Sequence, residues 1–494
     1  MHNSDLVELL AQLRPDECRR LRSYLRDTVL ARPEVLTLTA YTLEHLGDED
    51  DSTLSRATVY AVIFPGQPPV ANKLEKLMSD TLHLVRQFVA VEMATRDLRE
   101  MQQQVLLQRF YREREMEKKF RQSRGQVAKL KEQPGNWVPQ DYYFQFLSEE
   151  EESMFLSARN QKKDDINLWN TIQSLDEYYL VERLRYTCVL LNQNQLVSLK
   201  LPPLKDWLPI DLSSAHLQWF FEKPLGKLFL LAVNLFSSDS ANSVDQNKKL
   251  EEFIEFLQDN EKVIPTEFIN SLEIFACNYG IKQINQGHYS FLHSIFLIQK
   301  RRVKSGRIYI NGLIKSSEFH SIVVAGLRLG DNVWVKDFIE EHRDKILGAM
   351  PSSDYYQFNL IYYYFQTKEY EPELHTLLTS NYEDMLYKLQ SKVLEIKILY
   401  EMSRRPKVDY RTLEFLENKV EAAIVFFFRE KNIPPDKRKM YKRFADTMKR
   451  ILHAEGKGDA KRLEKIRTDI DASDLIADRQ WLLSVVDGLL KHNK

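Results

Sequence analysis

Three histidines form the first group of residues in the sequence with the potential for metal chemistry. His288 and His293 lie five residues apart, and His320 follows further along the chain. Imidazole is a common zinc ligand, but two histidines share a helix face only at a spacing of three or four, whereas a spacing of five turns them about 140° apart. The pattern therefore predicts exposed or hydrogen-bonded histidines, and we expect no metal site.

A run of four carboxylates, Glu149 to Glu152, is the densest acidic cluster and has the charge to attract a cation. Ser148 precedes the run, and acidic residues in a first helical turn are stabilised by the helix dipole. We therefore predict that the run is the solvated start of a helix and not a cation site.

Motifs that carry catalytic chemistry are absent from the sequence. It contains no Gly-x-Gly-x-x-Gly, no phosphate-binding loop, no His-Glu-x-x-His and no Gly-x-Ser-x-Gly elbow. Cys18, Cys188 and Cys277 lie far apart without Cys-x-x-Cys spacing, which excludes a disulfide framework that can be read from sequence and fits a reducing cytosol. We expect a protein without catalytic residues or cofactor, and not an enzyme.

Two segments are basic, although the formal net charge of the chain is -1. The segment from Arg109 to Lys131 is the first. The second, residues 436–467, holds twelve Lys or Arg against five acidic residues. Its candidate contacts to a phosphate backbone are Lys437, Arg438, Lys439, Lys442, Arg443, Lys449 and Arg450. Lys and Arg release counterions when they bind nucleic acid. However, apolar residues at a spacing of four, Met440, Phe444, Met448 and Leu452, are typical of an ordinary amphipathic helix with a solvated basic face.

The elements that must position these residues are helices. Apolar residues are 43% of the chain, with only 15 Gly and 17 Pro in 494 residues, so helix breakers are scarce. In "KLEEFIEFLQDN" the residues Leu250, Phe253, Ile254 and Leu257 fall on one helix face. Pro65, Pro68 and Pro69 cannot continue a helix, so "FPGQPP" is predicted to join two helices.

The sequence gives no sign of a membrane span or a secretory signal. The longest apolar run, "PLGKLFLLAVNLF", is shorter than the roughly 18 residues that a span requires, and the first residues lack a basic segment followed by an apolar one. We therefore expect a cytoplasmic location and no membrane span.

Helical pairs recur in the C-terminal half. Turns at Gly330-Asp331 and near Lys368-Glu369 lie 38 residues apart, close to the period of a helical-pair repeat. The second pair resembles a tetratricopeptide repeat, with Tyr370 on the aromatic position after the turn and Leu360, Tyr364 and Leu377 on large apolar positions. It departs from that family at Ile361 and Glu373, where small residues are usual.

Nearly the whole chain also resembles a family of uncharacterised all-helical bacterial proteins. The resemblance lies in "IFPGQPPVANKLEKLMSDTLHLVRQF", "SLDEYYLVERLRYTCVLLNQNQ", "GLRLGDNVWVKDFIEEHRD" and "ADRQWLLSVVDGL". It implies an all-helical fold and no activity.

An aromatic stripe lies on the first helix of the tetratricopeptide-like pair. Its members share one helix face, which in that register is the concave side: Tyr355, Phe358, Tyr362, Phe365 and Gln366. Two interpretations remain open. Another helix covers the stripe, which is then core, or the stripe is a groove that binds a partner segment.

Together these patterns predict an all-α protein in which helical hairpins stack into a curved, tetratricopeptide-like solenoid. We expect a helical unit over residues 1–94, a hairpin region over 95–236, and repeats over 248–494. The apolar face of Trp481, Leu482, Val485, Val486 and Leu489 predicts a C-terminal capping helix. The expected function is a non-catalytic scaffold or adaptor that binds a protein or peptide on its concave surface, and the alternative is a nucleic-acid-associated regulator that uses the basic helices of 436–467.

Overall fold

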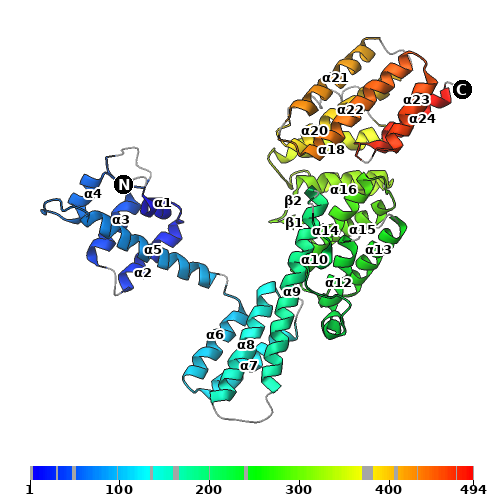
Figure 1. Ribbon diagram of the computed structural model, residues 1–494. Coiled ribbons are helices and arrows are strands. Elements are labelled where there is room, and N and C mark those ends of the chain that lie inside the picture. The colour runs from blue at the N-terminus through cyan, green and yellow to red at the C-terminus, as the bar shows by residue number, and fades with distance from the viewer. Residues whose placement is uncertain are drawn as a thin grey trace. The chain divides into compact units, whose positions relative to one another are not determined.

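The computed structural model describes residues 4–28, 32–46, 52–96, 98–133, 137–158, 166–197, 199, 201–237, 243–369, 382–404, 410–430, 432–473 and 475–492. These residues are predominantly helical, which confirms the prediction that the protein is built mainly from helices (Figure 1). The chain divides into two compact units, Met1–Val127 and Ala128–Lys494.

The first unit is built from helices in succession. They are α1 Asp5–Ala11, α2 Pro15–Asp27, α3 Pro33–Glu44, α4 Arg56–Ile63, α5 Lys73–Arg96, α6 Glu100–Glu113 and α7 Glu117–Lys131. A hydrophobic cluster that runs from Leu6 to Phe88 unites α1 to α5, and these residues lie within the expected unit 1–94. The division between the two compact units falls later, inside α7.

The proline-rich segment between α4 and α5 is a helix–helix joint, as predicted. The hydroxyl of Tyr60 donates a hydrogen bond to the carbonyl of Pro68 (2.9 Å) and accepts one from the Val70 amide (3.1 Å). Because the side chain of Tyr60 is buried, these bonds attach the joint to the core of its unit.

The second unit begins with long helices. They are α8 Pro139–Ala158, α9 Ile166–Val197, α10 Leu204–Trp207, the 3-10 helix η2 Ala215–Leu217, α11 Gln218–Phe221, α12 Pro224–Phe236, α13 Ser243–Asp259, α14 Thr266–Asn285 and α15 Phe291–Lys304. Helix α9 packs against α8, α12 and α14. The predicted stripe on α13 is buried from Leu250 to Leu257, so its apolar period was interpreted correctly.

The unit continues through a small sheet and further helices. They are β1 Tyr309–Ile310, β2 Leu313–Lys315, α16 Ser316–Arg328, α17 Asn332–Glu341, β3 Ile346–Leu347, α18 Ser352–Thr367, α20 Met385–Ser403, α21 Tyr410–Arg429, α22 Pro435–Gly456, α23 Ala460–Asp471 and α24 Arg479–His492. From α20 onward each helix packs against the next one in the sequence.

The three-stranded sheet was not predicted. β1 and β2 pair antiparallel, with Tyr309 opposite Ile314, while β2 and β3 pair parallel, with Ile314 opposite Ile346. The β1–β2 turn is Asn311-Gly312, and both residues have positive φ (52° and 80°), the conformation of a tight hairpin turn that Asn-Gly favours.

The predicted turn at Gly330-Asp331 joins α16 to α17, and the predicted turn near Lys368 follows α18, where the helix expected after it lies outside the described residues. Gly330 has φ +78° after α16, and the Asp331 amide donates to the Gly326 carbonyl (3.0 Å), which closes the end of the helix. Lys368 adopts the same left-handed conformation after α18. Tyr370, Glu373 and Leu377, on which the tetratricopeptide register depends, lie outside the described residues.

Helix α24 packs on α22 and α23. Leu482 and Val486 are fully buried in a cluster with residues of α20 to α23, and Val485 is nearly so. The predicted apolar face is therefore a packing face. Within the described residues, no helix combines the length and the apolar composition that crossing a membrane requires.

Candidate functional site

The aromatic stripe on α18 is buried. Tyr355 and Phe358 are 0% exposed, Tyr362 is 5% and Phe365 is 6%, while Gln366 alone is exposed. The four rings belong to a hydrophobic cluster that includes α16, α17 and α20. The groove interpretation is therefore not realised in this structure, because no ring of the stripe is open to a partner.

Polar partners from α16 and α20 explain how so many tyrosines are accommodated in the core. The Tyr355 hydroxyl donates to Asp384 Oδ2 (2.9 Å), and the Tyr387 hydroxyl donates to the Ser316 carbonyl (2.8 Å). Asn359 Nδ2 in turn donates to the Tyr355 carbonyl (2.8 Å) and to the Tyr387 hydroxyl (3.2 Å). Buried hydroxyls with such partners avoid a desolvation penalty.

Three of the seven residues of the predicted basic patch on α22 pair with acidic groups of the same chain. Lys442 pairs with Asp446 of its own helix (2.7 Å), Lys449 pairs with Glu421 of α21 (2.5 Å), and Arg450 pairs with Asp469 of α23. These three cations have carboxylate partners, although exposed ion pairs of this kind contribute at most about 1 kcal/mol each.

The other members of the patch divide into two groups. Arg443 Nη1 donates to Ser473 Oγ and to the Leu475 carbonyl (both 3.2 Å), so it positions the segment before α24. Lys437, Arg438 and Lys439 lie in the first turns of α22 and form no ion pair with the described residues.

The predicted solvated helix start at Glu149 to Glu152 is wrong. These residues lie in the second half of α8, and Glu149, Glu151 and Glu152 are buried. Lys131 Nζ lies 2.7 Å from Glu149 Oε1. The sequence shows the charges of the run, but not which faces of the helix become enclosed.

His320 lies in the core of the second unit. Its Nδ1 is 2.8 Å from Asn359 Oδ1, and its ring packs near Phe358, Tyr362 and Tyr387. Burial lowers the pKa of His320 to about 4, so the imidazole is neutral near pH 7. Among the described residues, no group of three His, Cys, Asp or Glu side chains is placed to bind a metal ion.

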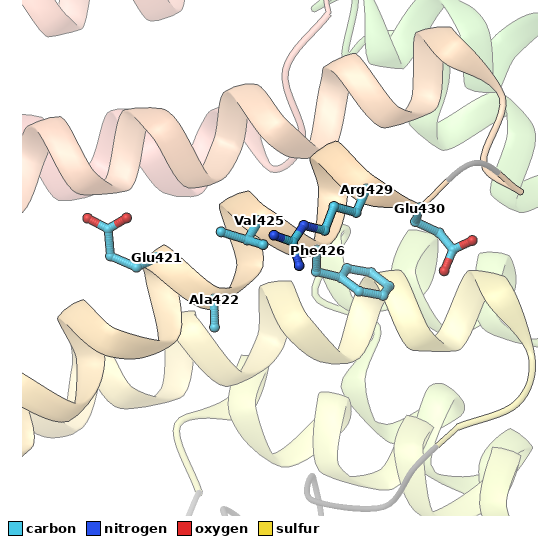
Figure 2. A pocket seen from close by; sticks show the side chains of 6 residues that line it. All are labelled: Glu421, Ala422, Val425, Phe426, Arg429 and Glu430. Atoms are coloured by element: carbon cyan, nitrogen blue, oxygen red, sulfur yellow. The ribbon is translucent and has the colours of Figure 1, made fainter.

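Residues along helix α21 line an open concavity of about 540 Å³. The labelled residues in Figure 2 that line it come from α21 and the residue after it: Glu421, Ala422, Val425, Phe426, Arg429 and Glu430. Ligand pockets enclose a small molecule between several elements. A hollow that is lined by a single helix cannot enclose a small molecule in this way. The α21 concavity therefore lacks the geometry of a small-molecule site.

An exposed apolar face on α9 was missed in the sequence. Ile172, Leu175, Tyr179 and Tyr186, here called the α9 seam, are between 44% and 60% exposed, and Trp169 beside them is 68% exposed. The seam residues follow at spacings of three, four and seven, so they share one side of the helix. Few charges interrupt its first half, because Asp176 and Glu177 are the only ionisable residues other than tyrosine between positions 166 and 181.

The opposite side of α9 holds the helix in place. Val181, Leu184 and Cys188 are 0% exposed, and the helix packs against α8, α12 and α14. A helix that buries one apolar face and exposes a second one presents a rigid surface of large side chains.

A cluster of charged side chains joins distant parts of the second unit. Arg328 Nη2 of α16 donates to Asp478 Oδ1 (3.2 Å), and Lys397 Nζ of α20 donates to Asp478 Oδ2 (3.0 Å). Burial raises the pKa of Asp478, but Lys397 and Arg328 outweigh it and hold the pKa below its ordinary value, so the carboxylate is charged.

Comparison of the chain with protein-family models, with curated proteins and with solved structures finds no match in any of the three. The functional assignment therefore depends on the surfaces and clusters of this chain.

Proposed function

We propose that the protein is a non-catalytic cytoplasmic adaptor that binds an amphipathic helix of a partner protein on the α9 seam. The observation that carries this proposal is the exposure of Ile172, Leu175, Tyr179 and Tyr186 along one side of a well-anchored helix. Scattered single apolar residues are normal on a surface, whereas an aligned set marks an interaction site.

The spacing of the seam indicates the kind of partner. Apolar residues that alternate at three and four along a helix fit a second helix whose side chains insert between them. Trp and Tyr supply large contact area at a low cost in side-chain entropy and dominate the energetics of many interfaces. An amphipathic helix with a complementary apolar stripe is therefore the partner that we propose.

The helices that follow α9 support this function as a scaffold. From α20 to α24 each helix packs against the next one in the sequence, and α16, α17 and α18 also pack together. We propose that these helices stack into a tetratricopeptide-like solenoid. In such arrays each repeat contacts its neighbours and the assembly presents extended surfaces.

A photo-crosslinking amino acid at Tyr179, introduced into the full chain in its native host, tests the proposal. We expect a crosslinked peptide from another protein, and that peptide should carry apolar residues at alternating spacings of three and four. Introducing both Ile172→Glu and Leu175→Glu into the crosslinking variant should reduce the amount of crosslinked product roughly tenfold or more. The reason is that an unpaired charge buried in the interface with the partner costs more than about 1.4 kcal/mol of binding free energy.

The matched control is Val333→Glu, since Val333 is 77% exposed and lies on α17, whereas the seam lies on α9. This control should leave the crosslinked product unchanged. Crosslinks to a second copy of the chain alone, or no product at all, would contradict the adaptor function.

A further inference from the structure

Arg479 is a cation whose hydrogen-bonding capacity is not used within the described residues. Its Nε and Nη2 atoms are buried and have no hydrogen-bond partner, although the side chain as a whole is partly exposed. A buried donor without a partner loses its hydrogen bonds to water, so such groups in native proteins require an explanation, and binding of an anion from solvent is one of them.

The loop between α14 and α15 holds this guanidinium closely. A Cβ at Gly287 would lie 2.8 Å from Arg479 Nη1, and Gly287 has φ +101°, so only glycine allows the approach without strain. Tyr289 follows in the same loop and is half-buried. Burial raises the pKa of Tyr289, and Arg479, Arg328 and Asp478 all act on it electrostatically, which places the four side chains in one neighbourhood.

The charges in this neighbourhood do not balance. Both carboxylate oxygens of Asp478 already accept hydrogen bonds, one from Arg328 and the other from Lys397. The side chain of Lys397 is 1% exposed, whereas that of Arg328 is 27% exposed. Two cations therefore share the Asp478 carboxylate, and Arg479 adds a third positive charge beside Tyr289. An additional anion would reduce the repulsion between these cations.

We propose that Arg479, with Arg328 and the Tyr289 hydroxyl beside it, binds an oxyanion between the α14–α15 loop and the start of α24. The ligand is a carboxylate or a phosphate group, because the planar guanidinium presents two parallel N–H donors that match either group. Lys397 and Asp478 form the base of the site and fix Arg328. The site is independent of the α9 seam.

Thermal unfolding of the full chain in rising concentrations of inorganic phosphate, and separately of succinate, tests the site. Sodium chloride holds the ionic strength constant. We expect Tm to rise with the logarithm of the concentration of at least one of the two probes once that concentration exceeds its Kd, because a ligand at free concentration L that binds only the folded state stabilises it by RT ln(1 + L/Kd). The probe that acts at lower concentration identifies the oxyanion.

Arg479→Gln should abolish the rise, whereas Arg467→Gln should retain it, since Arg467 is an exposed arginine that pairs with Asp471 and Asp487. If Arg479→Gln does not fold, Arg479→Lys keeps the charge without the planar fork and should weaken the apparent affinity roughly tenfold. The absence of such a logarithmic rise in the unmodified chain would overturn the proposal. An unchanged rise in Tm in whichever Arg479 variant folds would also overturn the proposal.

Discussion

Lys397 Nζ lies 3.0 Å from Asp478 Oδ2, although 81 residues separate the two in the sequence. The lysine side chain is 1% exposed, and its ammonium also lies 5.0 Å from the ring centroid of Phe365 and 5.6 Å from that of Trp481. The contact attaches the start of α24 to α20. Helix α24 is thus held by a buried ion pair as well as by its apolar face.

Removing the carboxylate of this pair should destabilise the protein strongly. We expect Asp478→Asn to lower the free energy of unfolding by about 3–5 kcal/mol, because Lys397 is left buried without a charged partner. Urea denaturation of the full chain measures the change. Arg467→Gln is the control, since its ion pairs are half-exposed and should contribute below about 1 kcal/mol. Equal losses in the two variants would show that burial of Lys397 is not decisive.

His320 should make stability depend on pH between about 6.5 and 4. Burial lowers the pKa of His320 to about 4 in the folded chain, so the unfolded chain binds a proton in this range and the folded chain does not. Stability is therefore fully present above pH 6.5 and falls toward pH 4, by about 3 kcal/mol in total.

Urea denaturation as a function of pH checks this expectation in His320→Gln, whose amide can still donate to Asn359. In this variant the slope of the free energy of unfolding against pH should be smaller by the contribution of one proton, which is about 1.4 kcal/mol per pH unit. The pKa of Asp478 lies below the window, so this carboxylate does not contribute to it. A slope identical to that of the unmodified chain would rule out a neutral buried His320.

Two glycines should respond to alanine in opposite directions. A Cβ at Gly348 would lie 2.1 Å from the hydroxyl oxygen of Tyr355, whose side chain is fully buried and bonded to Asp384, so Gly348→Ala should cost roughly 1–3 kcal/mol. Gly125 lies inside α7 with nothing within 4 Å of the added carbon, so Gly125→Ala should gain roughly 0.5–1 kcal/mol. If both variants melt above the unmodified chain, or both melt below it, the predicted opposite effects are refuted.

The helices were predictable because their signals are local. The apolar period of α13 requires no knowledge of its neighbours, since Leu250 and Phe253 must share a face once the segment is helical. Proline made the α4–α5 joint predictable, and Gly330 did the same for the turn before α17. Each signal depends on the chemistry of a few consecutive residues.

The strands were missed for the opposite reason. Two or three residues are too few for an alternating pattern, although Asn311-Gly312 carries a recognised hairpin signal. The second apolar side of α9 was also missed, because apolar residues on two sides of a helix obscure a single stripe.

Contacts between distant segments could not be predicted from one sequence. The basic residues of α22 are evident in the sequence, but the acids of α21 and α23 that pair with Lys449 and Arg450 are not. The aromatic stripe raised the same problem, since only tertiary packing determines whether Tyr355 and Tyr362 are covered. For the same reason, Arg328 and Asp478, 150 residues apart, were not recognised as partners.

The three cysteines differ in their accessibility to thiol reagents. Cys18 in the first unit is partly exposed, while Cys188 on α9 and Cys277 on α14 are buried, and burial raises the thiol pKa of both. A maleimide dye at neutral pH should therefore attach first at Cys18 and give a single fluorescent label on the N-terminal unit. Slow labelling at Cys188 and Cys277 would then record how often the interior around α9 and α14 opens to solvent, without any engineered cysteine.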